Sequence, residues 1–362
     1  MSDKITLLHG SGGAATSELI HDVFAGEFDN DILSGMEDAA VLPIRASRLT
    51  DGVSDSSAGS SDGLTVMADQ STGRVAVTTD SFVIDPVEYP GGNIGRLAVC
   101  GTVNDLLMRG AVPVYLTCGW ILETGADMEV VRRCAASMAD TAREAGVSIV
   151  AGDTKVIGGD GGIYINTTGV GIVPDNVDIS AANAKPGDVI LVSGNLGDHH
   201  AAVLSERMSV MTDITSDTAP LTEMCRALSG LKVHTMRDVT RGGLGTVLKE
   251  LCVASGMTFI IHDDLIPVSA KVRDFCGLLG LDPVYMGNEG KMVVIVDPAD
   301  EEQALEAMRS SAYGADAVRI GEVTEPDGSL GVSGIGALYM KTAIGGLREL
   351  DIMQGEGLPR IC

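Results

Sequence analysis

The sequence predicts a mixed fold that combines an α+β domain with an α/β domain. The chain has 362 residues, which corresponds to about two domains of ordinary size. Stretches typical of strands and of helices alternate along it, more regularly in the second half. Hydrophobic residues make up 45% of the chain but aromatic residues only 3%, so we expect an aliphatic core. We place the domains at residues 1–176 and 177–344, followed by a mobile tail at residues 345–362.

The first domain is expected to contain strands and two long helices. Gly146 follows the last apolar position of the second helix, which is a common way for a helix to end. Residues 47–73 hold mainly small and polar side chains, which predicts a flexible surface insertion. The expected strands are 4–9, 75–84, 113–122, 147–157 and 163–173, and the expected helices are 94–111 and 127–146.

The second domain alternates between the two periodicities, and the pattern stops at Gly345. The expected strands are 183–194, 257–262, 291–297 and 316–323, and the expected helices are 199–211, 218–229, 241–255, 268–279 and 300–311. The last residues hold glycine and proline and have no clear period, so we expect an arm without local structure. Fully extended, such an arm would reach roughly 55–60 Å.

Charge and cysteine usage exclude several classes of protein. The formal net charge is −25, which disfavours binding to nucleic acid or to an anionic membrane surface. No apolar run approaches the roughly 20 residues that span a bilayer, and the N-terminus does not resemble a signal peptide. The 7 cysteines form no CxxC pair, which favours a reducing compartment over a zinc site or a disulfide framework. We therefore expect a cytoplasmic protein.

Acidic residues at turns or beside small residues form the most suggestive pattern. A single aspartate in a turn is most often a cap, but several that follow strands can converge at one crevice. Carboxylates there suit Mg²⁺ bound to a nucleotide triphosphate. The set consists of Asp38, Asp80, Asp105, Asp153 and Asp238.

Three further motifs have both a structural and a functional interpretation. In TRGGLG (240–245), Gly242 and Gly243 open a helix whose N-terminus would favour an anion. Lys155 in GDTK and Glu289 in NEGK could supply a cationic phosphate contact or a general base, or could lie in solvated turns. Histidines 199 and 200 at a helix start are more typical of a cap or of packed polar residues. The chain lacks a P-loop sequence, which excludes P-loop NTPases.

The last residue, Cys362, is the sharpest signal. A thiol at the tip of an extended arm can enter a crevice and leave it again. A thiolate is a strong nucleophile and a good carrier of an acyl-type group. A CaaX box requires the cysteine four residues from the end, so prenylation of that type is excluded.

Together these motifs resemble the HypE family of hydrogenase maturation proteins, within the PurM-like superfamily of aminoimidazole ribonucleotide synthetases. The resemblance covers nearly the whole chain, and the terminal PRIC distinguishes HypE from the other members. It is carried by HGSGG (9–13), TTDSFVIDP (78–86), PGGNIGRLAVCGTVNDLLMRGAVP (90–113), AGDTKVI (151–157), SGNLGDHHAAVLS (193–205), MRDVTRGGLGTVLKE (236–250), NEGK (288–291) and PRIC (359–362).

The resemblance implies a PurM-like fold, a homodimer and a reaction. The N-terminal domain would form a β-barrel with its copy, and the C-terminal α/β domain would close over the nucleotide. HypF would place a carbamoyl group on Cys362, and ATP would drive its dehydration to a thiocyanate. The cyano group would then pass to iron held by HypC and HypD for a [NiFe] hydrogenase.

The resemblance also implies the roles of individual residues. Cys362 would carry the substrate, Glu289 would be the base, and Lys155 would stabilise the developing charge. ATP and Mg²⁺ would be the cofactors, with all five aspartates as metal ligands. The nucleotide site would comprise Asp38, Asp80, Asn104, Asp105, Asp153, Asp238, Gly242 and Gly243.

Two other functions remain open at this point. A selenophosphate synthetase-like enzyme would transfer the ATP phosphate to a small nucleophile, and would require a reactive cysteine near the N-terminus. Residues 1–36 contain no cysteine, which counts against it. A non-enzymatic, metal-handling scaffold would use Cys362 as a soft ligand and would bind metal without ATP.

Overall fold

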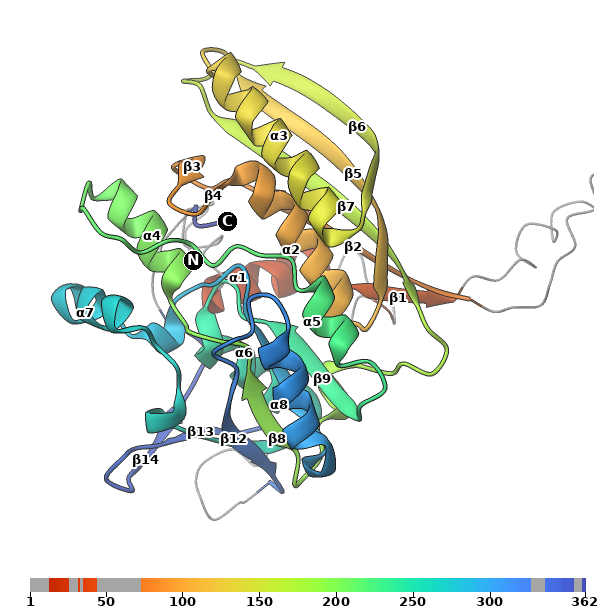
Figure 1. The fold of residues 1–362 in the computed structure, drawn as a ribbon, viewed down its shortest axis with the longest axis vertical. Helices are drawn as coiled ribbons and strands as arrows, with labels where there is room; N and C mark the ends of the chain where they lie inside the picture. The colour runs from red at the N-terminus through yellow and green to blue at the C-terminus, as the bar shows by residue number, and fades with distance from the viewer. Residues whose placement is uncertain (1–12, 26–31, 33–34, 44–72, 327–335, 355–359) are drawn as a thin grey trace, which may run out of the picture.

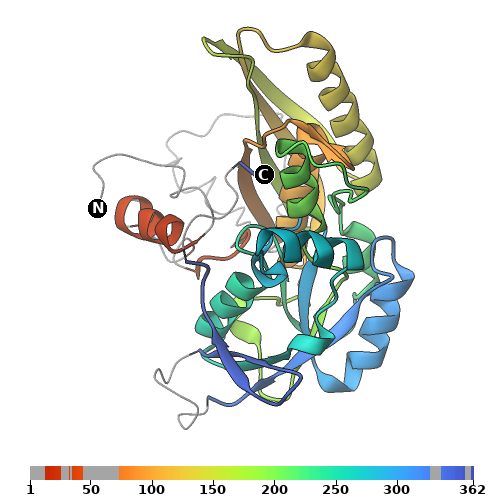
Figure 2. The same cartoon turned by 90° about the vertical axis from the view of Figure 1, so that its left-hand side faces the viewer.

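The computed structural model describes residues 13–25, 32, 35–43, 73–326, 336–354 and 360–362. Two sheets form the framework, one in each half of the chain, and they lie one above the other in Figure 1. The chain's C-terminus returns to the five-stranded sheet and lies beside it (Figures 1 and 2). In the part of the chain that is described, no helix has the length and apolarity needed to cross a membrane.

The first sheet has the order β1-β2-β7-β5-β6 and is antiparallel except for the parallel β5–β6 pair. A two-stranded hairpin, β3–β4, precedes the first long helix. The strands are β1 (Ala40–Pro43), β2 (Arg74–Phe82), β3 (Glu88–Tyr89), β4 (Gly92–Asn93), β5 (Val112–Glu123), β6 (Ser148–Ile157) and β7 (Ile163–Val173). The chain before β1 contains α1 (Ala14–Leu19) and a π-helical turn (Ile20–Ala25).

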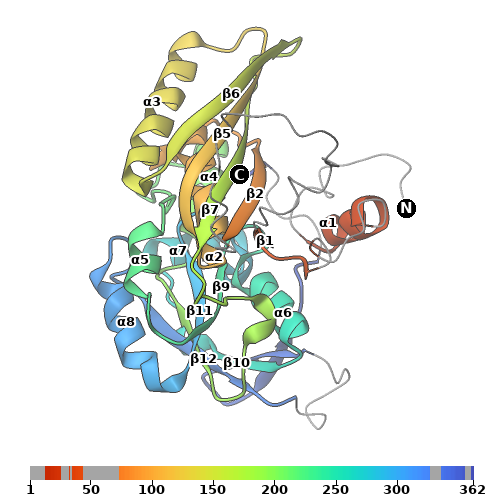
Figure 3. The ribbon, with the colours of Figure 1, turned by 90° about the vertical axis from the view of Figure 1, so that its right-hand side faces the viewer.

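Helices α2 (Ile94–Met108) and α3 (Met128–Ala145) cover one face of this sheet (Figure 3). The side chain of Asn93 caps α2, and α3 ends at Gly146 with a φ of 75°. Gly169 of β7 allows α2 to approach closely, because a Cβ there would lie 2.7 Å from Thr102. Every residue of the edge strand β6 is exposed.

The second sheet has the order β14-β13-β10-β12-β8-β11-β9, in which only β10 and β13 pair in parallel. The strands are β8 (Val189–Val192), β9 (Val233–Asp238), β10 (Thr258–His262), β11 (Met292–Val296), β12 (Val318–Thr324), β13 (Leu338–Lys341) and β14 (Leu347–Leu350). The helices are α4 (Asp198–Arg207), α5 (Thr222–Ala227), α6 (Gly243–Ser255), α7 (Ala270–Leu279) and α8 (Glu301–Ser310). Short 3₁₀ turns lie at Ala181–Asn183, Asp263–Leu265, Pro283–Tyr285 and Pro298–Asp300.

Helices cover both faces of this second sheet (Figure 3). Leu191 of β8 belongs to the buried cluster that includes α5 and α8, whereas its neighbour Ile190 belongs to the cluster that includes α6. Successive residues of a strand face opposite sides, so both faces of β8 are buried. This explains why its sequence is continuously apolar instead of alternating.

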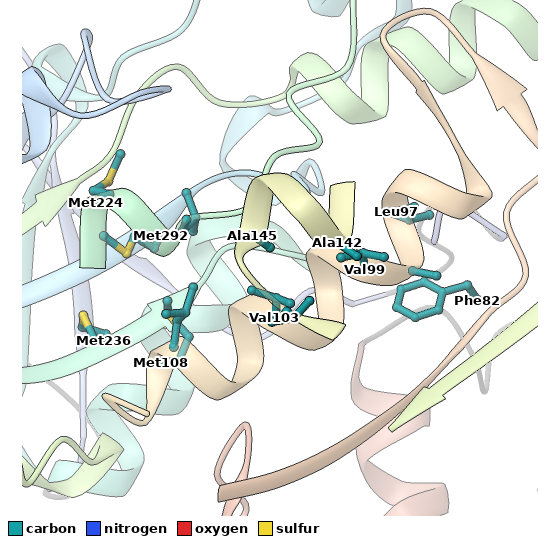
Figure 4. Close-up of a cluster of buried hydrophobic side chains, with 14 of the residues drawn as sticks. Phe82, Leu97, Val99, Val103, Met108, Ala142, Ala145, Met224, Met236 and Met292 are labelled. Atoms are coloured by element: carbon teal, nitrogen blue, oxygen red, sulfur yellow. The ribbon is translucent and has the colours of Figure 1, made fainter. Parts of the chain in front are cut away.

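One hydrophobic cluster joins the two halves of the molecule. Val103 and Met108 of α2 lie in it with Met224 of α5, Met236 of β9 and Met292 of β11 (Figure 4). Methionine is flexible and fills irregular gaps, which suits a junction between two differently shaped layers. The cluster therefore fixes how the two halves face each other, and with it the site between them.

Most of the predicted elements are confirmed, with ends that shift by a few residues. The prediction missed α1 and the short strands β1, β3, β4, β9, β13 and β14. Strand β14 lies in the segment 345–362, which was expected to lack structure. Helix 199–211 ends earlier, at Arg207, and helix 218–229 is reduced to Thr222–Ala227. The predicted strand 4–9 and nearly all of the insertion 47–73 lie outside the described residues.

Candidate functional site

The C-terminus of the chain docks against the segment that follows β2. The backbone N–H of Val83 donates to a main-chain oxygen of Cys362 at 3.1 Å, and the N–H of Asp85 donates to the carbonyl oxygen of Arg360 at 3.0 Å. The Arg360 side chain donates back to the carbonyl oxygen of Val83 at 3.0 Å. The last three residues are thus held beside the sheet by main-chain hydrogen bonds, and this fixes where the terminal thiol lies.

The Cys362 thiol lies among charged groups from both halves of the chain. Burial raises its pKa to about 12, and the positive charge of Arg241 opposes that rise. The carboxyl groups of Glu289, Asp80 and Asp238 raise it further. In the docked position the thiol is therefore protonated at neutral pH.

Asp80 and Asp105 form the half of the acidic cluster that the first sheet and α2 provide. Thr102 donates to Asp80 at 3.3 Å, and Thr78 donates to Asp105 at 2.9 Å. The two carboxyl groups are also hydrogen-bonded to each other. Burial raises the pKa of both, and the pKa of Asp105 is raised further by the charge of Asp80. Burial and mutual repulsion therefore both favour the protonated form in this pair.

Asp238 and Glu289 complete the acidic cluster from the second sheet. Asp238 is the last residue of β9, and burial together with Asp38 and Asp80 raises its pKa to about 8. Glu289 stands before β11, is 4% exposed, and has a pKa raised well above its ordinary value by burial and by Asp238 and Asp217. The structure thus brings the candidate base and three predicted aspartates together.

Asp38 reaches the same cluster but is already paired. Its carboxylate lies 2.6 Å from the guanidinium of Arg237. Burial, with the charges of Glu37 and Glu250, nevertheless raises its pKa to about 6. Asp38 is therefore a member of the acidic cluster whose charge Arg237 partly balances.

The glycines of the TRGGLG motif are required by close packing at the start of α6. Gly242 and Gly243 have φ angles of 81° and 67°, and a Cβ on Gly243 would lie 2.6 Å from the carbonyl oxygen of Val284. Only glycine adopts this conformation and fits this space without strain. Arg241, directly before them, interacts with Cys362, Glu289 and Asp80. The motif thus also delivers a cation to the site, which the sequence analysis missed.

Three predicted site residues do not join the acidic cluster within one chain. The Asn104 amide accepts from the N–H of Leu221 at 2.9 Å and donates to the carbonyl oxygen of Ala219 at 3.1 Å, so it ties α2 to that loop. Asp153 and Lys155 lie on the exposed strand β6, where their side chains form an ion pair at 2.6 Å. Neither is among the groups that shift the pKa values of the cluster carboxyls.

The donor set of the acidic cluster fits Mg²⁺. Carboxylate oxygens are the ligands that Mg²⁺ prefers, and a divalent cation would relieve the mutual repulsion that raises the pKa values of the cluster carboxyls. Among the described residues, however, no three Asp, Glu, His or Cys side chains are already arranged to hold a metal ion. The chemistry of the donors, rather than a preformed cage, is what fits the cation.

Two family models match the two halves of the chain. The N-terminal domain of AIR synthase related proteins matches residues 36–173, and the C-terminal domain of the same family matches residues 185–333. These proteins define the PurM-like fold that the sequence analysis expected. Together the two matches cover more than half of the chain.

The chain is also similar to characterised proteins over its full length. Carbamoyl dehydratase HypE of Cupriavidus necator is 42% identical, with 100% of this chain and 95% of that protein aligned. A chain in the crystal structure of a HypE–HypF complex is 40% identical with a TM-score of 0.79, covering 92% of this chain and 99% of that one. HypE crystallised with ATP is 41% identical with a TM-score of 0.76, covering 99% and 100%. Relatives this similar over their full length, together with the two family models, show that the chain belongs to the HypE carbamoyl dehydratase family of AIR synthase related proteins.

Proposed function

We propose that this chain uses ATP to dehydrate a carbamoyl group carried on the sulfur of Cys362, which yields a thiocyanate for [NiFe] hydrogenase maturation. The observation that carries the proposal is the docked terminal thiol, which faces Arg241 and Glu289. The names of the relatives support the reaction, and a relative crystallised with ATP supports the energy source. Neither selenophosphate synthesis nor a scaffold role is favoured by these relatives.

The chemistry requires a phosphate because oxide is a poor leaving group. The carbamoyl oxygen would attack the terminal phosphorus of ATP, so that a C–O–P linkage forms, ADP leaves and one N–H proton is lost. Cleavage of the C–O bond would then release phosphate, while the second N–H proton leaves and the nitrogen forms a triple bond to carbon. The balance is one ATP converted to ADP and phosphate, and one carboxamide converted to a nitrile with loss of two protons from nitrogen.

Glu289 is the residue that would accept protons from the carbamoyl nitrogen. It is buried close to Cys362, and its raised pKa brings a carboxylate nearer to the basicity that proton abstraction needs. Arg241 would balance negative charge that develops between the sulfur and the phosphate. Glu289 would thus act on the nitrogen of the carbamoyl group, and Arg241 on the negative charge near the phosphate.

We also propose that Mg²⁺ and ATP bind at the acidic cluster. Asp80, Asp105 and Asp238 would hold the cation, together with Asp38 when it is released from Arg237. When bound, the cation supplies neutralisation of phosphate charge. Gly242 and Gly243 would allow the nucleotide to approach the N-terminus of α6, and Asn104 would support the site by holding the loop at Ala219.

A homodimer would explain the open face of the five-stranded sheet. Apolar side chains are exposed there at Tyr115, Ile121 and Ile172, and β6 is an unpaired edge strand. Exposed edges and apolar faces are usually covered in soluble proteins, and two such sheets can close into a β-barrel. In that dimer Asp153 and Lys155, which lie on β6, would serve the site of the second copy.

The remaining partners follow from the family. A structure of a HypE–HypF complex supports HypF as a partner. We expect HypF to donate the carbamoyl group, and HypC and HypD to receive the cyano group. All seven cysteines of the chain are free thiols, which agrees with the reducing cytoplasm.

The function is tested by mass spectrometry of the C-terminal peptide. The full chain is incubated with HypF, carbamoyl phosphate and ATP, and then digested with a protease that cuts after glutamate. We expect the peptide to gain the mass of a carbamoyl group and then to lose that of one water. The Cys362→Ala variant should fold and bind ATP but show neither change. An unmodified wild-type peptide would contradict the proposal.

A further inference from the structure

We propose that helix α4 holds the C-terminal tail in its reactive position, and that His199 and Arg207 are the positioning residues through which it does so. This inference rests on the function proposed above, because it concerns the residue that carries the substrate. The two side chains lie near opposite ends of α4 and contact consecutive backbone carbonyl groups of the tail. We refer to them as the α4 clamp.

His199 makes the inner contact of the α4 clamp. Its Nε2 lies 2.8 Å from the carbonyl oxygen of Ile361, and its Nδ1 lies 2.7 Å from the hydroxyl of Ser216. A carbonyl oxygen only accepts hydrogen bonds, so Nε2 carries the proton and Nδ1 accepts from Ser216. Burial lowers the pKa of His199, which favours this neutral form. The imidazole is therefore a fixed donor aimed at the tail.

Other groups set the orientation of the His199 ring. The Thr218 hydroxyl lies 2.7 Å from that of Ser216 and 3.2 Å from that of Tyr89. The Tyr89 ring meets the imidazole edge-on with 5.3 Å between centroids. The N–H of Ser216 donates to the carbonyl oxygen of Pro90 at 2.7 Å. Such a network holds a side chain in one orientation even when its own partner departs.

Arg207 makes the outer contact of the α4 clamp. Its guanidinium donates to the carbonyl oxygen of Arg360 in the tail and to that of Asp85 after β2. One side chain thus bridges the tail and the segment against which the tail docks. Planar guanidinium groups are suited to such paired contacts because their donors have fixed directions.

The α4 clamp binds the main chain of the tail and makes no contact with the Cys362 thiol, which would carry the carbamoyl group. The contacted atoms are backbone oxygens of Arg360 and Ile361, so the Cys362 side chain takes no part in them. The Ile361 side chain is 4% exposed and faces Gly287, where a Cβ would lie 3.6 Å from its Cδ1. Gly287 lies two residues before Glu289. The docked tail therefore lies against the loop that carries the candidate base.

Weakening the clamp should affect carbamoyl transfer and dehydration differently. Transfer of a carbamoyl group from HypF requires the thiol to be accessible, whereas dehydration requires it to be docked. A variant with a weakened clamp should therefore lose dehydration while carbamoylation is retained or accelerated. A residue with a merely structural role would lower both.

The experiment measures how fast N-ethylmaleimide alkylates Cys362 in the native full-length protein, by mass spectrometry of the C-terminal peptide. His199→Leu should accelerate alkylation at least about fivefold, since one net hydrogen bond is worth roughly that factor. His199→Gln, whose amide can still donate, should restore part of the protection. Glu206→Gln is the matched control, because Glu206 is an exposed charge on the same helix; it should leave the rate unchanged.

A second variant keeps the test decisive if His199→Leu does not fold. Arg207→Met removes the outer contact of the α4 clamp at a half-buried position, and should also accelerate alkylation. Wild-type alkylation rates in both variants would overturn the clamp. If alkylation responds as expected but the wild-type protein never dehydrates its carbamoyl group, the clamp stands and the proposed function fails.

Discussion

The backbone N–H of Glu289 donates a hydrogen bond of 3.1 Å to Oδ1 of Asp217, whose Oδ2 lies 3.3 Å from Nζ of Lys291. Gly290 lies against the same segment, because a Cβ there would be 1.9 Å from the carbonyl oxygen of Asp217. The backbone of the candidate base is therefore held by Asp217, whose ion-pair partner Lys291 lies two residues after Glu289 in the sequence. Loss of either charge should disturb the position of Glu289 as well as the stability of the fold.

Lys291→Met should lower the free energy of unfolding by about 3 kcal/mol, because it leaves the carboxylate of Asp217 buried without its cation. Urea denaturation measures this effect. Lys271→Met is the matched control, since Lys271 pairs with Asp213 at an exposed position, where an ion pair contributes little. If Lys291→Met lowers the free energy of unfolding no more than Lys271→Met does, the buried ion pair contributes no more to stability than the exposed one.

Glu289→Gln should slow dehydration by roughly 10²–10⁴-fold, the usual contribution of a general base. Carbamoylation of Cys362 by HypF should continue, so the C-terminal peptide should accumulate in its carbamoylated form. The raised pKa of Glu289 adds a pH dependence: the wild-type single-turnover rate should increase with pH as the carboxyl group loses its proton. A variant that dehydrates at the wild-type rate would remove Glu289 from the mechanism.

Asp198→Asn should change how stability depends on pH. Burial and the charges of Asp217 and Asp316 outweigh Lys291 and raise the pKa of Asp198 from 3.8 to about 6. A group with a raised pKa in the folded state binds its proton more tightly there, so its stabilisation is complete below pH 3.8 and is lost as pH rises through 6.

The asparagine variant resembles the protonated form and lacks this loss. Its free energy of unfolding relative to wild type should therefore increase between about pH 4 and pH 6 and stay constant above. Denaturation curves recorded at several pH values measure the difference. A constant difference across that range would contradict the interpretation.

A mixture of two inactive variants should regain activity if Lys155 acts on the partner's site. In the proposed dimer, Lys155→Met and Glu289→Gln chains would combine to give one site with both native residues. Each variant alone should be inactive in dehydration, whereas the mixed dimer should turn over, as measured by loss of water from carbamoylated peptide. No recovery after verified subunit exchange would show that Lys155 does not act on the site of the second copy.

The dimer itself is tested by Ile121→Arg. Ile121 is 43% exposed on the open face of the five-stranded sheet, so a charge there should be tolerated by the monomer fold but not by an apolar interface. Light scattering should show monomers, while circular dichroism stays unchanged. A variant that keeps the wild-type mass in solution would contradict this interface.

The sequence predicted the long elements better than the short ones. The helix at Met128–Ala145 has a clear apolar stripe and a glycine stop, so both its type and its end could be predicted. Strands β9 and β14 were missed, and they are the two edges of the second sheet. Short edge strands bury few side chains, so their apolar periodicity is weak.

The acidic cluster could be predicted from residue type, but its membership depends on the order of strands. Asp80 and Asp238 converge because β2 and β9 both border the junction of the two sheets, whereas Asp153 lies on the far edge strand β6. His199 and Ile361 are 162 positions apart, so their contact has no local signature. The charged groups near Arg241 are also distant in the sequence, so the sequence pattern pointed to the neighbouring glycines but not to Arg241 itself.

The methionine-rich cluster that α2 shares with β9 and β11 limits which parts of the molecule can travel during turnover. Separating the two halves would expose the buried side chains of Met108, Met236 and Met292 to water at the same time. The free-energy cost would have to be met in every catalytic cycle. Undocking three terminal residues requires the loss of a few hydrogen bonds and one isoleucine contact. The architecture thus confines the movement to the C-terminal tail, while the two halves of the molecule that form the site stay in place.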